Sequence, residues 1–250
     1  MAPPSQRTLA LAARLEGAEG YDLVVADARW VAPWLRELVL SGPLADMGPL
    51  AGQDLMVAVG DDELQARWRR YTIESFDAAA GTATLWVSTR SRGPGARWAA
   101  AAHEGDRVEV IGPRGKVRLD DAASHHVFVV DDAGIAAMRA MAAARPAATT
   151  ATCLVAAHPR IEGADGAEQW FEDHDALLGA LGAALGAARG AAHAYVLCEL
   201  GLMRAVAARL GAEGLGADQL DAKPYWRADR ANEDHGEPDK ATPIGEPARS

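Results

Sequence analysis

An arginine, a tyrosine and a threonine are consecutive in a strand-like run that begins at Trp68. Side chains alternate across a strand, so Arg70 and Thr72 share one face. Tyr71 and Ile73 share the opposite face. Arginine binds phosphates, a tyrosine ring stacks on planar rings, and a threonine hydroxyl bonds a polar ring edge, which together are the groups a flavin requires. The alternative is an ordinary barrel strand, with arginines that reach solvent beside a half-buried tyrosine.

Glycine and proline precede a helix-forming stretch further along the chain. Gly93, Pro94 and Gly95 lead into a segment that runs from Ala96 to residue 102 and contains Trp98. The N–H groups in the first turn of a helix have no partner within it, so they suit a phosphate. A plain turn before a short packing helix is the alternative.

A different pattern begins in the second half. Residues 127–130 are a continuous apolar run, which is typical of a strand buried on both faces. In open parallel sheets, ligands bind beyond the carboxyl ends of the strands. The first such end carries Asp131. The small residues Ala133 and Gly134 would let a cofactor approach the next helix, which begins at Ile135.

Two later clusters could also contact a ligand. Glu199 follows another predicted strand, where its carboxylate could hold a ribose or a nicotinamide amide. A negative charge that favours the start of a helix is the alternative. Tyr225 and Trp226, followed by Arg227, come after the last predicted α/β element. They either anchor the chain end or cover a flavin and form a substrate mouth.

The elements that must position these groups fall into two types. Short runs rich in β-branched and aromatic residues, separated by Gly, Pro and Asp, predict a sandwich or closed barrel. Strands and helices then alternate, which predicts a parallel sheet with crossover helices. The short runs are residues 21–30, 35–40, 54–59, 68–76, 82–88 and 107–111.

These two patterns predict a β + α/β fold with two domains. An antiparallel β-barrel covers residues 21–122, and a parallel-sheet α/β domain covers residues 123–231. Residues 1–20 form a flexible leader or a peripheral helix. The polar residues 232–250 contain no apolar pattern, so we expect a disordered tail.

Composition and charge exclude several classes of function. At 250 residues and 49% hydrophobic content, the chain is long enough for two cores. A formal charge of −10 argues against nucleic acid or an anionic membrane as the main partner. No apolar run is long enough to span a bilayer, and we see no secretory signal, so we expect a cytoplasmic protein without membrane insertion.

Cysteine and histidine do not suggest a metal site. Cys153 and Cys198 lie in apolar surroundings, typical of buried side chains rather than of a disulfide. His125 and His126 are adjacent, so on a strand they would point in opposite directions and could not easily hold one ion. The motifs of serine hydrolases, zinc proteases and P-loop proteins are absent from the sequence.

Taken together, these motifs resemble the siderophore-interacting protein family. Its members are FAD-containing ferric-siderophore reductases, related in fold to the ferredoxin–NADP reductases. The resemblance runs from about residue 21 to residue 230, and the order and spacing of the motifs make it specific. The motifs are residues 70–73, 93–99, 105–106, 112–115 and 131–132, Glu199, and residues 225–227.

The resemblance implies FAD on the barrel and a nicotinamide nucleotide on the α/β domain. The residues that it assigns to cofactor binding are Arg70, Tyr71, Thr72, Ile73, Thr89, Gly95, Ala96, Trp98, Asp131, Ala133, Gly134, Ile135, Glu199, Tyr225 and Trp226. Thr89 departs from the family, which has a histidine there. Residues 130–137 lack the glycine and proline of the family's turn. The sequence of residues 198–203 is similar to the Cys-Gly turn of ferredoxin reductases. This similarity bears on which electron donor the protein uses.

The implied activity is flavin-dependent reduction of ferric siderophores, with electrons from NAD(P)H through FAD, or with ferredoxin as the alternative donor. Hard oxygen donors hold Fe(III) better than Fe(II), so reduction releases the metal without an iron ligand from the protein. Lys223, Arg227 and Arg230 are candidates to attract an anionic siderophore, unless they are only solvated surface charges. The competing functions are a general flavin reductase or electron-transfer flavoprotein without a siderophore site, and a binding protein without turnover.

Overall fold

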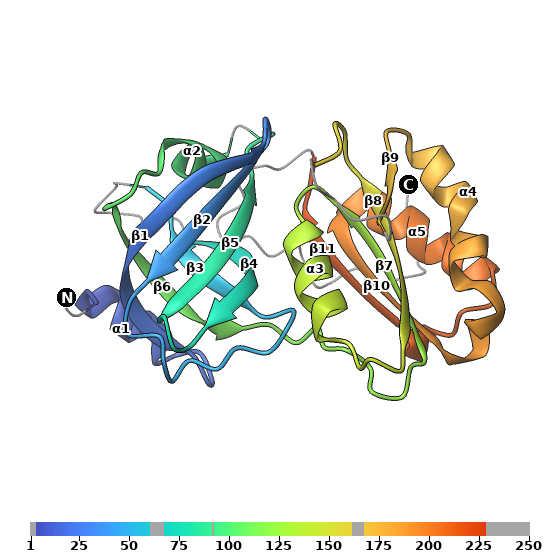
Figure 1. Ribbon diagram of the computed structural model, residues 1–250, viewed down its shortest axis with the longest axis horizontal. Helices are drawn as coiled ribbons and strands as arrows, with labels where there is room; N and C mark the ends of the chain where they lie inside the picture. Colours follow the sequence, from blue (N-terminus) through green and yellow to red (C-terminus); the bar gives the residue numbers. More distant parts are fainter. Residues whose placement is uncertain (1–3, 61–67, 92, 162–167, 229–250) are drawn as a thin grey trace, which may run out of the picture. The chain divides into compact units, whose positions relative to one another are not determined.

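The computed structural model describes residues 4–60, 68–91, 93–161 and 168–228. Two compact units make up this part of the chain: the first comprises the described residues up to Arg118 together with residues 139–144, and the second comprises the other described residues from Leu119 on. Figure 1 shows that the first unit is a β-barrel and that the second is a sheet flanked by helices. Each unit has its own hydrophobic core.

Six antiparallel strands close the first unit into a barrel, in the order β1-β2-β5-β4-β3-β6. Strand β5 shows how the sequence directs this fold, because Ala83, Leu85 and Val87 are buried in the core while the residues between them are partly exposed. Alternate residues of a strand therefore either fill the barrel or face outward. The strands are β1 Glu19–Ala32, β2 Leu35–Ser41, β3 Asp54–Ala58, β4 Trp68–Asp77, β5 Thr82–Ser88 and β6 Arg107–Arg114.

Two helices accompany the barrel. Helix α2, Pro94–Ala101, lies between β5 and β6 in the chain, and its Ala99 is part of the barrel core. Helix α1, Gln6–Ala12, begins at the N-cap Ser5. Glu109 of β6 accepts hydrogen bonds from Ser5 Oγ at 2.8 Å and from Thr8 Oγ1 at 2.6 Å. One carboxylate thus attaches this peripheral helix to the barrel.

Five parallel strands form the sheet of the second unit, in the order β11-β10-β7-β8-β9. All seven residues of β7 are buried, as the continuous apolar run predicts. The strands are β7 His125–Asp131, β8 Thr150–Ala156, β9 Glu168–Phe171, β10 Ala192–Glu199 and β11 Leu220–Trp226. The helices are α3 Ile135–Ala144, α4 His174–Leu185 and α5 Leu200–Ala212, with short 3₁₀ turns at Gly186–Ala191 and Ala217–Gln219.

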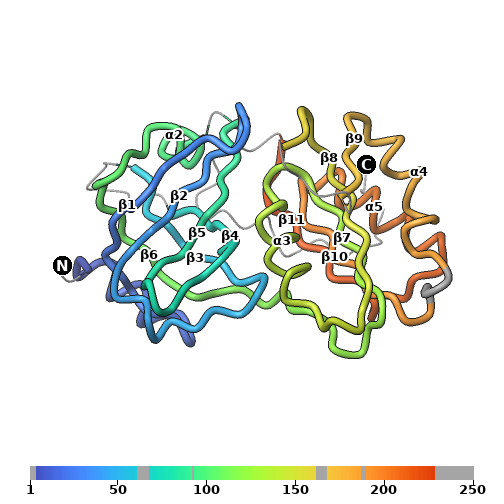
Figure 2. Tube along the Cα trace, viewed as in Figure 1, coloured from blue at the N-terminus to red at the C-terminus, as the bar shows by residue number. Residues whose placement is uncertain are grey.

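Helices α4 and α5 cover one face of this sheet, and α3 lies on the other (Figure 2). Leu177 of α4 and Val206 of α5 belong to the same buried cluster as Val127 and Val196 of the central strands. The crossovers bring the carboxyl ends of β7, β10 and β11 next to one another, because these strands are parallel neighbours. Asp131, Glu199 and Trp226 stand at those three ends.

The predicted fold class is confirmed, since a closed antiparallel barrel precedes a parallel sheet with helices. Two strands, β9 and β11, were not predicted. Tyr225 and Trp226 therefore end a strand of the sheet rather than follow its last element. Pro224 is tolerated within β11 because, among the described strands, β11 lies at the edge of the sheet and pairs with β10.

Some predicted features fall outside the described residues, namely Arg230 and the polar tail, residues 232–250. Both cysteines, Cys153 and Cys198, are buried, as predicted. Among the helices of the described residues, none is both long and apolar enough to cross a membrane.

Candidate functional site

Tyr71 lies half-buried on β4, where its ring stacks on Trp98 of α2, with 5.9 Å between centroids and 21° between planes. Gly95, in the first turn of α2, lies against the tyrosine hydroxyl, because an added Cβ would be 2.0 Å from Tyr71 Oη. Only glycine lets the start of α2 come this close. Burial raises the pKa of Tyr71, so its hydroxyl stays protonated and able to donate. Three residues predicted from two separate motifs thus form one cluster.

The first turn of α2 receives no hydrogen bond from a capping side chain in the described part of the chain. Gly93 is the N-cap, Pro94 follows it, and Gly95 and Ala96 are buried. Buried N–H groups in a first turn need an acceptor. A phosphate of FAD fits this requirement, since the N–H groups and the helix dipole both favour an anion.

The two arginines of β4 have different surroundings. Arg70 forms a two-pronged ion pair with Asp54 of β3, with Nε–Oδ1 at 2.9 Å and Nη2–Oδ2 at 2.6 Å. The side chains are only 15% and 5% exposed. Arg70 and Thr72 share a face, as predicted, and Thr72 lies opposite Asp54 in the strand register. The arginine predicted to bind phosphate is therefore engaged by a protein carboxylate.

Arg69 was not among the predicted site residues, although it shares the face of Tyr71 by strand alternation. Its Cγ would lie 3.4 Å from a Cβ placed at Gly95, so its side chain passes beside the start of α2. Its Nη1 donates to the carbonyl of Trp68 at 2.8 Å. By strand alternation, Arg69 rather than Arg70 is the cation expected next to Tyr71 and α2.

The remaining barrel residues of the predicted site contribute mainly packing and backbone contacts. Ile73 is 4% exposed within the barrel core, and its N–H donates to the carbonyl of Gln53 at 3.0 Å. The N–H of Thr89 donates to the carbonyl of Trp34 at 2.8 Å, and its side chain is partly exposed. Their assignment to FAD binding stays a prediction.

In the second unit, Asp131 ends β7 and is 4% exposed. Its Oδ1 accepts a hydrogen bond from the N–H of Ala133 at 2.9 Å. Its Oδ2 accepts from the N–H of Glu199 at 2.8 Å and from the indole N–H of Trp226 at 2.7 Å. Burial, and next the negative charge of Asp132, raise the pKa of Asp131 to about 7 against the effect of these hydrogen bonds.

Gly134 is the N-cap of α3, and packing explains its small size. A Cβ at this position would lie 2.1 Å from the carbonyl oxygen of Leu197, so glycine lets the helix start approach β10. Ile135, the first helical residue, is fully buried. Contact of Ala133, Gly134 and Ile135 with a nucleotide stays a prediction.

Glu199 is the N-cap of α5. Its Oε2 accepts from the N–H groups of Gly201 and Leu202, the latter at 3.1 Å. Its Oε1 accepts from the N–H of Ala228 at 3.3 Å. This arrangement matches the alternative of a helix-terminal charge, and a role in holding ribose or nicotinamide stays a prediction.

The aromatic pair at the end of β11 lies next to two of the predicted substrate-binding cations. Lys223 and Tyr225 share a face, and the lysine ammonium is 5.6 Å from the centroid of the tyrosine ring. Trp226 is 38% exposed, and the partly buried Arg227 follows it. Their contact with a substrate stays a prediction.

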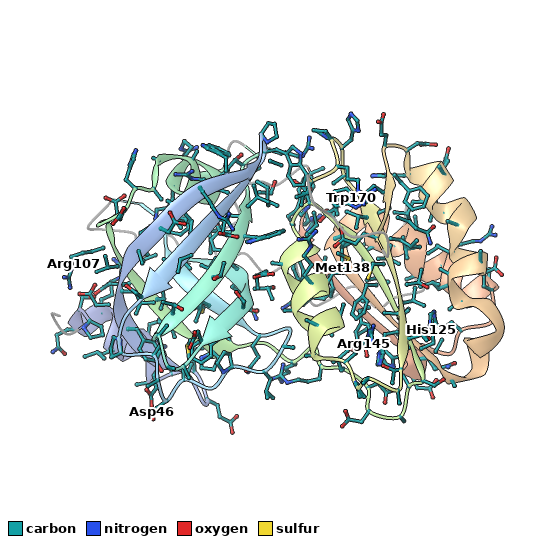
Figure 3. All side chains as sticks on the ribbon, in the orientation of Figure 1. Asp46, Arg107, His125, Met138, Arg145 and Trp170 are labelled. Atoms are coloured by element: carbon teal, nitrogen blue, oxygen red, sulfur yellow. The ribbon has the colours of Figure 1, made fainter. Side chains whose placement is uncertain are left out.

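The adjacent histidines of β7 make separate structural contacts. His125 (Figure 3) lies 2.7 Å from Thr150 Oγ1 through Nδ1 and 2.9 Å from the carbonyl of Ala184 through Nε2. His126 is fully buried and stacks on Phe128. As far as the structure describes the chain, no group of three or more His, Cys, Asp or Glu residues could hold a metal ion.

Comparison with protein families matches both units. The siderophore-interacting FAD-binding domain matches residues 47–117, and the siderophore-interacting protein family matches residues 123–229. Among solved structures, a siderophore utilization protein from T. fusca has a TM-score of 0.73 at 24% identity, over 88% of this chain and 97% of that one. Comparison with curated proteins gave no significant match.

Two further structures are similar in fold. The siderophore-interacting protein SipS from Aeromonas hydrophila has a TM-score of 0.70 at 24% identity, over 86% of this chain and 94% of that chain. Phthalate dioxygenase reductase has a TM-score of 0.65 at 21% identity, over 83% of this chain and 67% of that chain.

A barrel matched by an FAD-binding domain, followed by a parallel α/β sheet, defines the class: an FAD-binding protein whose fold is similar to that of ferredoxin reductases. Within this class, the chain belongs to the siderophore-interacting protein family. The family resemblance inferred from the spaced motifs is confirmed, and so is FAD as the cofactor of the barrel.

Proposed function

We propose that this protein reduces ferric siderophores, with electrons from NAD(P)H passing through FAD. The observation that carries the proposal is the cluster of Tyr71, Gly95 and Trp98 at the uncapped start of α2, within the region matched by the siderophore-interacting FAD-binding domain. When bound, FAD accepts two electrons from a nicotinamide and delivers them singly to a metal centre. The iron of the substrate becomes Fe(II), which hard oxygen donors hold less tightly.

In this proposal, different barrel residues bind different parts of FAD. Tyr71 offers a ring face and a protonated hydroxyl to the flavin, and Thr72 a hydroxyl to its polar edge. Arg69 and the first-turn N–H groups of α2 hold the phosphates. Arg70 can contribute to phosphate binding only by sharing its guanidinium with Asp54.

Support for a nicotinamide nucleotide as the donor comes from the architecture of the second unit. Its strands are parallel, and such sheets bind ligands at their carboxyl ends, where Asp131 and Glu199 lie. Phthalate dioxygenase reductase, similar in fold, is described as transferring electrons from pyridine nucleotides to a [2Fe-2S] centre. This is an analogy of fold, so reduced ferredoxin remains the donor to test against NADH and NADPH.

Attraction of the siderophore is assigned to cations near the end of β11. Many ferric siderophores are anionic, and the chain as a whole carries a formal charge of −10. A local group of cations is therefore needed to favour their approach. Lys223 and Arg227 lie beside Tyr225 and Trp226, and Arg230 follows in the sequence.

An anaerobic titration tests the proposal. The FAD-loaded protein is treated with NADH, NADPH or reduced ferredoxin, the loss of flavin absorbance is followed, and a ferric siderophore is then added with a chelator that colours only with Fe(II). We expect the bleached flavin to regain its absorbance as Fe(II) forms, faster than with free flavin as the acceptor. Free-flavin reduction that outpaces iron reduction would instead identify a general flavin reductase, and a protein that does not bind FAD would rule out both.

A further inference from the structure

One buried carboxylate connects the ends of three parallel strands in the second unit. Asp131 belongs to β7, and its Oδ2 accepts from the backbone of Glu199, on β10, and from the indole of Trp226, on β11. These partners are 68 and 95 residues away in sequence. The remaining oxygen accepts from Ala133 in the turn after β7. Both oxygens of Asp131 are thus used within the protein.

Glu199 extends the same arrangement to the chain beyond β11. Its Oε2 caps α5, and its Oε1 accepts from the N–H of Ala228, two residues past Trp226. The segment that leaves β11 is therefore held at two points, by the indole to Asp131 and by the backbone to Glu199. Trp226 as a whole remains 38% exposed, although its indole N–H is directed at Asp131.

We propose that Asp131 is a positioning residue that, together with Glu199, holds the end of β11 and fixes the orientation of the Trp226 indole at the ligand-binding edge of the sheet. The proposal deepens the proposed function and rests on it for the identity of the ligand. It also revises the sequence prediction, in which Asp131 contacts the nucleotide directly. Trp226 then provides the contact surface, and Asp131 acts through it.

Folding alone does not explain a carboxylate at this position. An unfolded aspartate ionises near pH 3.8, whereas the pKa of folded Asp131 is raised to about 7 by burial and by Asp132. Protonated Asp131 therefore stabilises the fold at low pH, and this stability is lost as the pH rises through 7. The ionised form, which accepts all three hydrogen bonds, is unfavourable for folding. Such a residue is more typical of a functional site than of a core.

Other titratable groups act on Asp131 or respond to it. Asp132, in the turn after β7, raises its pKa. Glu199 of β10 donates its backbone N–H and carries a second carboxylate. Cys198 of β10 is also buried, and its own pKa is raised first by burial and then by Asp131. On β11 the contacting group is the indole of Trp226, which does not titrate.

Nuclear magnetic resonance of the indole N–H tests the contact without FAD. The chain has seven tryptophans, and the resonance missing from Trp226→Phe identifies Trp226. In the wild type we expect this resonance to lie downfield at high pH and to move upfield through a midpoint near pH 7 as Asp131 is protonated. In Asp131→Asn it should lie upfield at every pH. A Trp226 resonance that lies at the position of a solvent-exposed indole at every pH in the wild type would overturn the proposal, even if the asparagine variant failed to fold.

Asp132→Asn is the matched control, since it removes one carboxylate at the neighbouring position. We expect it to keep the downfield resonance at high pH. Its midpoint should fall below that of the wild type, because the negative charge of Asp132 raises the pKa of Asp131. Loss of the downfield resonance in Asp132→Asn would show that Asp131 is not the group that holds the indole, which would also overturn the proposal.

Steady-state kinetics then connect the contact to function. Asp131→Asn and Trp226→Phe should each raise KM for the nicotinamide nucleotide or the siderophore on the order of tenfold, measured on FAD-loaded protein. The double variant should be no worse than either single variant, because both remove one contact. Additive losses would contradict a shared role. If the wild type shows no turnover while the indole titrates as expected, the proposed function fails and the positioning contact stands.

Discussion

The close approach of Gly95 to Tyr71 is the contact on which the candidate flavin site most depends. A Cβ at residue 95 would lie 2.0 Å from Tyr71 Oη, so any other side chain must displace the ring or the helix. The Tyr71 ring belongs to barrel strand β4 and packs against the barrel core, and it also stacks on Trp98 of α2. Helix α2 is therefore the part that would move, and its first-turn N–H groups would move with it.

We expect Gly95→Ala to weaken FAD binding by roughly tenfold to a hundredfold, because overpacking of this kind costs about 1–3 kcal/mol. Titration of FAD into the apoprotein, followed by flavin fluorescence, measures the effect. Gly179→Ala is the control, since a Cβ at Gly179 in α4 meets nothing within 4 Å. Equal FAD affinity in the two variants would show that Gly95 is not part of the FAD site.

Replacement of the two neighbouring arginines should have different effects, one on FAD binding and the other on stability. Arg69→Ala should weaken FAD binding by about 1.5–3 kcal/mol, the range for a hydrogen bond to a charged group, and leave stability nearly unchanged. Arg70→Ala leaves Asp54 buried without its partner, which should lower the free energy of unfolding by about 3–5 kcal/mol. Urea unfolding and FAD titration of both variants separate the roles. Loss of FAD binding without loss of stability in Arg70→Ala would restore Arg70 as the phosphate ligand.

At the scale of secondary-structure elements, the sequence predicted the strands whose conformation is determined by their own residue pattern. Strand β5 alternates buried and partly exposed residues along its length, and β7 is apolar throughout. Strand β11 has neither pattern and contains Pro224, so its conformation depends on pairing with β10. Such pairing is a tertiary interaction, which a local reading of the sequence does not contain.

The same limit applies to the candidate site. Two strand ends could be located, so Asp131 and Glu199 were selected as candidates, whereas Trp226 was selected as part of an aromatic pair after the last predicted element. That they bond to one another could not be predicted, because these contacts join residues far apart in sequence. Arg69 differs from these, since alternation alone places it on the face of Tyr71 and would have identified it.

Attachment of α1 to the barrel gives an element-scale prediction with a defined pH dependence. Burial raises the pKa of Glu109, but hydrogen bonds from Thr8 and Ser5 outweigh it, so the pKa lies below its ordinary value. The docking is therefore fully stabilised above the pKa of an unfolded glutamate and is lost as the pH falls through the lower, folded value. We expect faster hydrogen exchange in residues 6–12 in acid, below about pH 4.

Glu109→Gln should loosen α1 at neutral pH as well, because the N–H of Ser5 donates to Oε1 while the hydroxyls of Ser5 and Thr8 donate to Oε2, and an amide nitrogen cannot accept in place of either oxygen. Hydrogen exchange followed by mass spectrometry reports on this helix directly. The exposed Glu104, replaced by glutamine, serves as the control and should leave residues 6–12 protected. Equal protection in both variants would mean that apolar contacts, and not Glu109, hold α1.

At the scale of the whole molecule, the net negative charge of the protein opposes the approach of an anionic siderophore. Acidic residues outnumber Lys and Arg by 35 to 25, and an anionic siderophore is repelled at long range. A local group of cations overcomes this repulsion only within about 8–10 Å at physiological salt. Reversal of Lys223, Arg227 and Arg230 to glutamate should therefore raise KM for an anionic ferric siderophore by roughly tenfold or more. The increase should shrink as salt is added.

A triple charge reversal elsewhere on the surface distinguishes a local cation site from the electrostatic field of the whole protein. Arg14, Lys116 and Arg204 are exposed cations, and their reversal to glutamate changes the net charge by the same amount. If attraction is local, this control leaves KM nearly unchanged at physiological salt. Equal increases in the two variants would assign the effect to the field of the whole protein. Unchanged KM in both would mean that the cations beside Tyr225 and Trp226 play no part in attracting the substrate, and the siderophore would have to be guided by other groups.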